Sequence, residues 1–162
     1  MKKLMSIHGE ENMNAFELLK EDHARVSAIF EKLEPTTERA LKTREELFTK
    51  LKNELEVHTQ IEEQIFYPVL KEEEETRDIT LEGIEEHKVV KRLLQEMAAM
   101  PVDSEEWTAK LTVLKENVEH HVEEEEGEMF PKARKALPKE KIEEMGTRIE
   151  AAKKRLSATT RG

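Results

Sequence analysis

The chain has 162 residues, a length that fits one domain and is short for two. Charged residues make up 40% of it and hydrophobic residues 36%, with only 5 Gly and 5 Pro, which excludes collagen, many-stranded β-sandwiches and disulfide scaffolds. The formal net charge of −10 opposes binding to nucleic acid, and the lack of cysteine excludes thiolate metal sites. Long helices with narrow apolar stripes are favoured.

The first half of the chain predicts an arm followed by two helices. Residues 1–13 are polar and without pattern, so we expect a flexible N-terminal arm. Asn14 and Glu17 fit a capping box at the start of a helix that ends at the next proline. A second apolar run covers residues 47–69, and Pro68 should bend or end its helix.

The second half predicts two helices of the same kind. Residues 72–78 are mostly charged and are expected to form the connection that leads into it. A third apolar run covers residues 84–97. Asp103 and Glu106 fit a further capping box, which precedes a fourth run over residues 111–130.

A last stripe over residues 142–156 steps by three and four, and we expect it to cover the bundle, with a contact between two copies as the alternative. The runs together predict an all-α fold, an up-down-up-down four-helix bundle over residues 14–157 with an additional C-terminal helix and a flexible tail at 158–162. No run suits a signal peptide or a membrane helix. We expect a cytoplasmic monomer or homodimer with no membrane or nucleic-acid partner.

The two halves repeat one another, which predicts a duplicated helical hairpin. In each half two histidines lie 35 or 34 residues apart, and a glutamate follows the second histidine by four residues. That spacing places the second histidine and the glutamate on one face of a helix. The repeated residues are His23, His58 and Glu62, then His87, His121 and Glu125.

These six polar residues fall on apolar stripes, where they need compensating partners. A single buried histidine is usually a hydrogen-bonded core residue, and runs of glutamate usually form exposed faces. Their repetition at equivalent positions instead favours a dinuclear metal site in the bundle core, because two cations would compensate the buried carboxylates. Imidazole with carboxylate suits iron, manganese or zinc.

The chain resembles hemerythrin-like proteins of the HHE cation-binding family. The resemblance rests on the stretches KEDHARV, EVHTQIEEQIFYPVL, EEHKVV and VEHHVEEEEGEMFPKAR and covers roughly residues 14–156. It implies a four-helix bundle with a non-heme diiron centre, in which carboxylates and an oxo or hydroxo group bridge two Fe ions. Such a centre would interact with O2, NO or peroxide. By the same resemblance, His23 and His58 would bind one iron, His87 and His121 the other, and Glu62 and Glu125 would bridge them.

The sequence departs from oxygen-carrying members of that family at two places. Those members have a further histidine where this chain has Lys91, which cannot bind a metal while it is protonated. They also have a carboxylate five residues after the last histidine, a place held here by Glu126, so Glu126 is the alternative to Glu125. His120 falls off the apolar stripe and is expected outside the site. Fewer imidazoles leave a more open site, which argues against an oxygen carrier.

Three functions are compatible with these observations. The first is a diiron protein that senses or scavenges small oxidants or handles iron. The second is an oxidase or peroxidase-like enzyme at the same centre, and the third is a metal-free acidic bundle that binds partners. Tyr67 could donate a hydrogen bond to the site or bind a metal, but the favoured interpretation is packing beside Phe66 near the bundle end.

Overall fold

The computed structural model describes residues 13–161, with side chains described as far as Ser157. The expected arm therefore lies outside the described residues except for Met13. The long helices are α2 (Ala15–Leu33), α3 (Leu41–Ile61), α5 (Glu74–Ala98), α6 (Glu105–Glu124) and α8 (Lys139–Arg161). Two π-helical segments, η1 (Glu62–Phe66) and η2 (Glu125–Met129), continue α3 and α6 into the short helices α4 (Tyr67–Lys71) and α7 (Phe130–Ala136).

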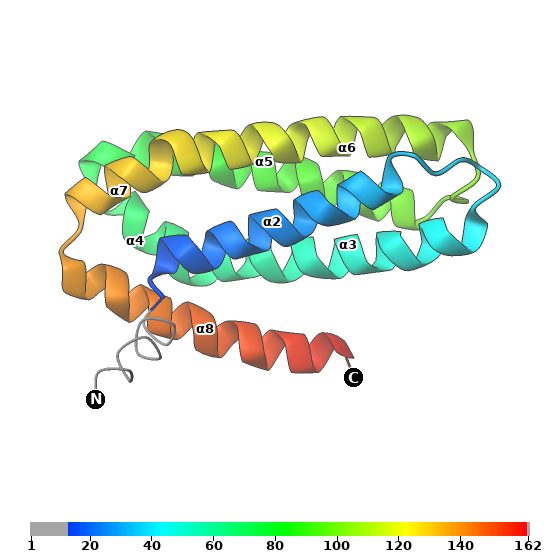
Figure 1. The fold of residues 1–162 in the computed structure, drawn as a ribbon. Coiled ribbons are helices and arrows are strands. Elements are labelled where there is room, and N and C mark those ends of the chain that lie inside the picture. Colours follow the sequence, from blue (N-terminus) through cyan, green and yellow to red (C-terminus); the bar gives the residue numbers. More distant parts are fainter. Residues whose placement is uncertain (1–12, 162) are drawn as a thin grey trace.

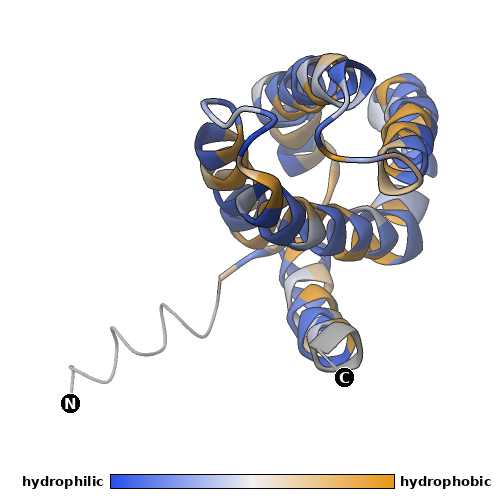
Figure 2. Cartoon of the chain, turned by 90° about the vertical axis from the view of Figure 1, so that its right-hand side faces the viewer, coloured by the Kyte–Doolittle hydropathy of each residue, from blue (hydrophilic) through white to orange (hydrophobic). Residues whose placement is uncertain are grey.

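The helices form a bundle of two hairpins with a fifth helix on its outside (Figure 1). Helix α2 packs on α3, and α5 packs on α6. Seen along the bundle, these four helices surround a common interior, and α8 lies to one side (Figure 2). The predicted all-α fold with an additional C-terminal helix is confirmed. Within the described range, every helix is too short or too polar to span a lipid bilayer.

Most of the expected helix boundaries hold, with two corrections. The capping box is present, because Asn14 and Glu17 each accept a backbone hydrogen bond from the other, at 3.0 and 3.1 Å. At the start of α6 the cap is Ser104 rather than Asp103, since the backbone N–H of Trp107 donates to Ser104 Oγ at 3.1 Å. The acidic connection is also shorter than expected.

Helix α5 begins at Glu74, so most of residues 72–78 are helical. Glu74 and Glu75 lie in the first turn, where negative charge interacts favourably with the helix dipole. The buried hydroxyl of Thr76 donates to the carbonyl oxygen of Leu70 at 2.6 Å and ties the start of α5 to the end of α4. A run of charges that suggested a loop is therefore a stable helix start.

The apolar core consists of two clusters, one toward each end of the bundle. The first is built around Phe16, Phe66 and Phe130, whose rings contact one another with centroids 5.2–6.0 Å apart. The second contains Trp107, whose ring meets that of Phe48 edge to face at 5.7 Å. The histidines and glutamates singled out by the sequence belong to neither cluster.

Helix α8 covers the first cluster, as the sequence predicted. Its stripe buries the four side chains of Ile142, Met145, Ile149 and Ala152. Gly146 lets the helix approach the start of α2 closely, because a Cβ there would lie 2.9 Å from the carbonyl oxygen of Met13 and 3.1 Å from the backbone nitrogen of Ala15. Helix α8 packs on both α2 and α3 and continues past residue 157 to Arg161.

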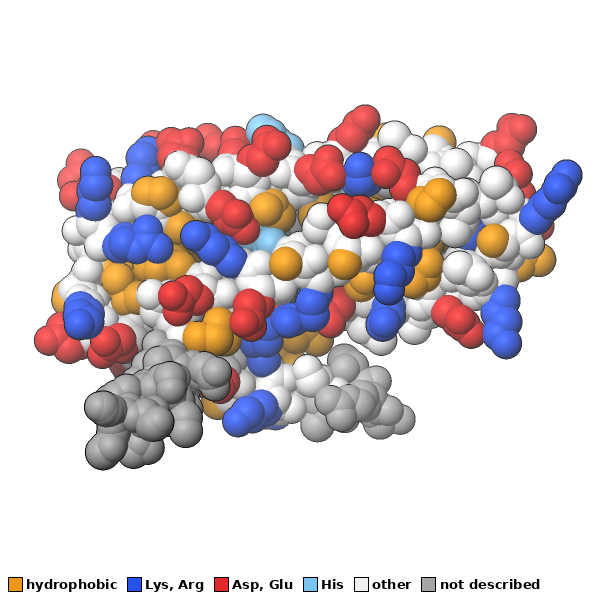
Figure 3. Space-filling model, in the orientation of Figure 1, with side chains coloured by type: hydrophobic (Ala, Val, Ile, Leu, Met, Phe, Trp, Pro, Cys, Tyr) orange, Lys and Arg blue, Asp and Glu red, His pale blue; other side chains and the backbone are white. Residues whose placement is uncertain are grey.

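Acidic and basic side chains are distributed over all the helices on the face shown in Figure 3. On that face the excess of acidic residues is not gathered into one patch. The charged side chains on this face thus form the ordinary solvated exterior of amphipathic helices.

Candidate metal centre

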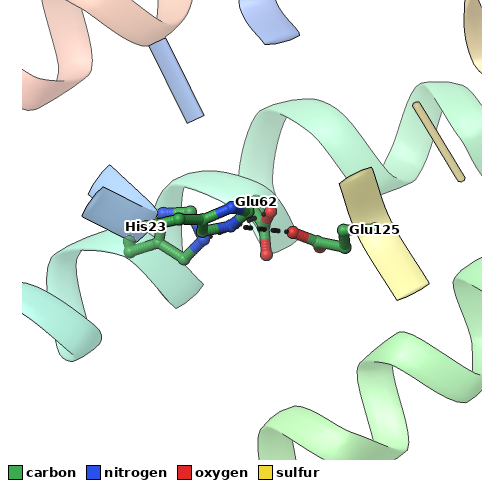
Figure 4. A group of neighbouring side chains, drawn as sticks. His23, Glu62 and Glu125 are labelled. Atoms are coloured by element: carbon green, nitrogen blue, oxygen red, sulfur yellow. Dashed lines mark ion pairs between the residues drawn. The ribbon is translucent and has the colours of Figure 1, made fainter. Parts of the chain in front are cut away.

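The structure brings the six repeated polar residues to one level inside the bundle. Helices α2, α3, α5 and α6 each contribute one histidine, and η1 and η2 each contribute a glutamate at their first residue. Glu62 and Glu125 are completely buried. The exposed fraction of the histidines is at most 7%. In Figure 4 the imidazole of His23 and the carboxylates of Glu62 and Glu125 point toward one another.

Each buried carboxylate directs its two oxygens to different pairs of imidazoles. Glu62 places Oε2 3.3 Å from Nε2 of His58 and Oε1 3.0 Å from Nε2 of His87. Glu125 places Oε1 3.1 Å from Nε2 of His23 and Oε2 3.1 Å from Nε2 of His121. Two groups of candidate metal ligands meet here: His23 and His58 with both glutamates, and His87 and His121 with both glutamates. Within each group the candidate ligand atoms lie within 4.8 Å of one another.

The outer nitrogen of each imidazole is held by a second carboxylate. In the first half, Nδ1 of His58 lies 2.8 Å from Oδ2 of Asp22. The equivalent contact in the second half joins Nδ1 of His121 to Oε1 of Glu86 at 2.5 Å. Such contacts fix the ring orientation and leave Nε2 free to bind a cation.

The remaining two imidazoles follow the same arrangement. Nδ1 of His87 lies 2.8 Å from Oε2 of Glu63, and Nδ1 of His23 lies 2.7 Å from Oε2 of Glu126. Helical spacing predicted no carboxylate in this outer position. A signal for it was present, because every outer carboxylate is the chain neighbour of a histidine or glutamate of the centre, in both halves.

The residues that the sequence left as alternatives lie at different positions in the structure. Glu125 lies at the centre, while Glu126, among the described contacts, meets the outer side of His23, and its side chain is 36% exposed. His120 is exposed and pairs with Glu124 at 3.2 Å. Lys91, at the place of the missing histidine, contacts Glu63 at 2.8 Å.

Tyr67 has two roles. Its ring packs beside Phe66, with centroids 6.0 Å apart, as the favoured interpretation held, and its hydroxyl also reaches the centre. It is 1% exposed, and its hydroxyl donates to Oε2 of Glu125 at 2.5 Å. The hydroxyl oxygen of Tyr67 also lies 3.3 Å from Nε2 of His87 and 3.2 Å from Nε2 of His121. Gly83 makes room for it, since a Cβ there would lie 3.0 Å from the hydroxyl oxygen.

The equivalent position in the second half is Phe130, which packs on His23 as Tyr67 packs on His87. The ring centroids lie 6.2 Å apart in the first pair and 5.1 Å apart in the second. Phenylalanine carries no hydroxyl, so the oxygen of Tyr67 is found on one side of the centre only. The two halves of the site are therefore chemically different despite their repeated histidines and glutamates.

The polar atoms at the centre fit a cation. Among the described residues, six buried side-chain N or O atoms have no hydrogen-bond partner, and five of them lie here. They are Nε2 of His23 and His58, both carboxylate oxygens of Glu62, and Oε1 of Glu125. Buried polar groups left in this way are costly unless a ligand satisfies them.

Charges within the centre change how its groups titrate when no cation is bound. Burial alone would lower the pKa of His58, but the charge of Glu62 and the hydrogen bond to Asp22 outweigh it and raise this pKa to about 10. Burial also opposes protonation of His87 and His121, and neighbouring carboxylates again outweigh it and raise the pKa of each imidazole. Burial would raise the pKa of Glu62, yet the surrounding histidines hold it well below 4.5.

Comparison with known proteins places this arrangement in a family. The sequence profile of the hemerythrin HHE cation binding domain matches residues 14–133, and the chain belongs to that family. A crystal structure of an HHE cation binding domain-containing protein from Mycobacterium kansasii superposes with a TM-score of 0.79 at 25% sequence identity. The match covers 91% of this chain and 89% of that one.

A curated relative is larger. The chain is 27% identical over 147 residues to a protein named DNA nickase from Nostoc sp.. The match covers 91% of this chain but 41% of the relative, so the chain spans less than half of that protein's length. Family and buried His and Glu groups together indicate a metal-binding hemerythrin-like protein.

Proposed function

We propose that the chain binds two iron ions in a carboxylate-bridged centre and interacts there with small oxidants. The division of each carboxylate's oxygens between two pairs of imidazoles is the observation that carries this proposal. Manganese and zinc are the alternative metals for the same donors. The ligands would be His23 and His58 for one ion, His87 and His121 for the other, and Glu62 and Glu125 for both.

The space beside the imidazoles favours a small ligand such as O2, NO or peroxide. A cavity of about 20 Å³ lies against the four histidines. The rest of its lining is mostly aliphatic and comes from all four bundle helices: Val26, Leu55, Thr59, Val90, Val118 and Val122. A cavity of this size holds one molecule as small as water or a diatomic gas. Bound iron would supply the redox chemistry that amino-acid side chains lack.

Tyr67 favours the second candidate, a peroxidase-like enzyme. Its buried hydroxyl keeps a proton at the centre and donates a hydrogen bond to Glu125. Burial first, and then the negative charges of Glu125 and Glu62, raise the pKa of Tyr67 well above 10, which keeps the phenol protonated. A protonated phenol beside Nε2 of His87 and His121 suits an activity in which oxygen atoms of a peroxide must accept protons.

Metal content tests the first part of this proposal. We expect about two irons per purified chain by plasma mass spectrometry, and essentially none in the variant His58→Ala/His121→Ala. The control is His120→Ala, which removes an exposed imidazole of the same helix and should keep both irons. A wild-type chain without metal, even after anaerobic loading with ferrous iron, would leave a helical bundle of another function.

Hydrogen peroxide separates the two candidate functions. Many molecules consumed per iron centre would identify an enzyme, and a single stoichiometric oxidation would identify a sensor, scavenger or iron-handling protein. Tyr67→Phe removes the hydroxyl while keeping the ring, so it should reduce turnover if the phenol delivers protons. Turnover equal to that of the wild type would remove the tyrosine from the catalytic role.

Metal binding should release protons. Because the pKa of His58 is raised to about 10, its imidazole is protonated at neutral pH without metal and must lose that proton to bind. We expect at least one proton released per chain at neutral pH, with apparent iron affinity rising about tenfold per pH unit for each proton. The rise should level off as the pH passes the raised pKa. An indicator in weakly buffered anaerobic solution measures the protons, and an affinity that does not change with pH would contradict the prediction.

DNA nicking is not part of this proposal. The matched relative is more than twice as long as the match, and its named activity belongs to the whole protein. A net charge of −10 opposes contact with a phosphate backbone.

A further inference from the structure

The four outer carboxylates differ in their exposure to water. Asp22 is almost completely buried, with 4% of its side chain exposed. The side chains of Glu63, Glu86 and Glu126 are 27–36% exposed. A buried carboxylate needs cationic partners, because it cannot be stabilised by water.

Two cations bind Asp22, and the more buried one comes from the C-terminal helix. Lys153 of α8 and Arg25 of α2 both contact Oδ1 of Asp22. The side chain of Lys153 is 20% exposed and that of Arg25 is 44% exposed. The other oxygen, Oδ2, faces Nδ1 of His58 at 2.8 Å. A continuous chain of contacts therefore runs from α8 through Asp22 to an imidazole of the centre.

The packing of α8 sets the position of Lys153. Ile149 lies one turn before it and is completely buried, and Ala152 beside it is 2% exposed. Lys153 therefore lies at the edge of the face that α8 packs on α2 and α3. This helix follows the segment that matches the family profile, which ends at residue 133.

The equivalent contact in the second half is built differently. Glu86 takes the place of Asp22 and holds His121. Its other oxygen faces the exposed His120 at 3.8 Å, and its partners belong to α5 and α6 themselves. Among the contacts described, only those of the first half of the centre include a residue of α8.

We propose that Lys153 is a positioning residue for the metal ion bound by His23 and His58. It fixes the carboxylate of Asp22, which in turn fixes the imidazole of His58 for metal binding. This inference rests on the proposed function, because it assigns a role at the same centre. It makes the two metal positions unequal, since one of them depends on the docking of α8 and the other does not.

Binding of ferrous iron under anaerobic conditions, measured against a chromophoric chelator, tests the inference. Lys153→Gln should weaken one of the two stepwise binding constants by about tenfold and leave the other unchanged. Lys154→Gln, on the exposed side of the same turn, is the control and should behave as the wild type. Lys153→Arg keeps the charge and should restore most of the lost affinity.

A double-mutant cycle shows whether Lys153 acts through Asp22. Asp22→Asn should weaken the same constant, and adding Lys153→Gln to it should have little further effect. Proton NMR of the ferrous protein gives a second readout, in which the exchangeable imidazole N–H signals are shifted by the iron. We expect one of these signals to move in Lys153→Gln and the others to stay.

The outcomes separate this inference from the proposed function. Two equal losses of affinity in Lys153→Gln would mean a general loss of packing and would overturn the positioning role, as would additive effects with Asp22→Asn. Unchanged constants and unchanged imidazole signals would also overturn it. A wild-type chain that binds no iron would instead refute the proposed function itself.

Discussion

Glu62→Ala should abolish binding of both iron ions, whereas His87→Ala should remove one. The carboxylate of Glu62 approaches His58 with one oxygen and His87 with the other, at 3.3 and 3.0 Å, so its loss affects both metal positions. The imidazole of His87 belongs to one group of candidate ligands only. Iron per chain, determined after desalting of anaerobically loaded protein, measures both effects.

The neighbouring residue supplies the control for this prediction. Glu63 is also a carboxylate of η1, but it contacts the outer nitrogen of His87. Glu63→Ala should therefore keep two irons and bind one of them about 10- to 100-fold more weakly. A Glu62→Ala protein that still holds one iron firmly would show that the two positions do not share this carboxylate.

Removal of the metal should lower the melting temperature by roughly 15–30 °C, the second large effect that we expect. Without cations, the centre keeps five buried polar atoms that lack a hydrogen-bond partner among the described residues. An ion present at a thousand times its dissociation constant stabilises the folded state by about 4 kcal/mol. For a domain of this size each kcal/mol is worth about 2–4 °C, and two ions contribute.

Circular dichroism melts with and without a chelator measure this shift. The variant His58→Ala/His121→Ala is the control, because it should melt at the same temperature in both solutions. An equal chelator effect in wild type and variant would show that the stabilising metal is bound elsewhere. No effect in the iron-loaded wild type would contradict a structural contribution of the centre.

The residues at the centre were predictable because their signal is local and repeated. Spacing of four residues between His58 and Glu62 places both on one helix face, and the same spacing recurs at His121 and Glu125. The hairpin then needs only its apolar stripes to bring those faces together. Apolar residues that recur every three or four positions along a helix are enough to specify which helix faces meet.

The contacts between helices could not be read from periodicity in the same way. Asp22 reaches the imidazole of the neighbouring helix, and the direction of a side chain across a helix interface depends on packing that spacing does not encode. The role of Lys153 depends on how α8 docks, which involves residues more than a hundred positions away from Asp22 in the sequence. The start of α5 was missed because acidic residues are common both in loops and in the first turn of a helix.

The π-helical segment η1 explains why helical spacing alone did not favour Tyr67 as a residue of the centre. The backbone N–H of Tyr67 donates to the carbonyl oxygen of Glu62, which lies five residues earlier, whereas in an α-helix the acceptor lies four residues earlier. In an α-helix, which turns about 100° per residue, a residue five positions after Glu62 would be rotated about 140° away from it. One wide turn cancels most of that rotation and returns the tyrosine to the angular phase of the glutamate.

The same phase shift occurs at η2, where the N–H of Phe130 donates to the carbonyl oxygen of Glu125. Each half of the molecule thus spends one extra residue to turn an aromatic ring back toward the centre. Regular α-helical winding of η1 with the same number of residues would rotate everything after Glu62 by about a quarter of a turn. The bundle would keep its four histidines without the wide turn, but the phenol would face away from them.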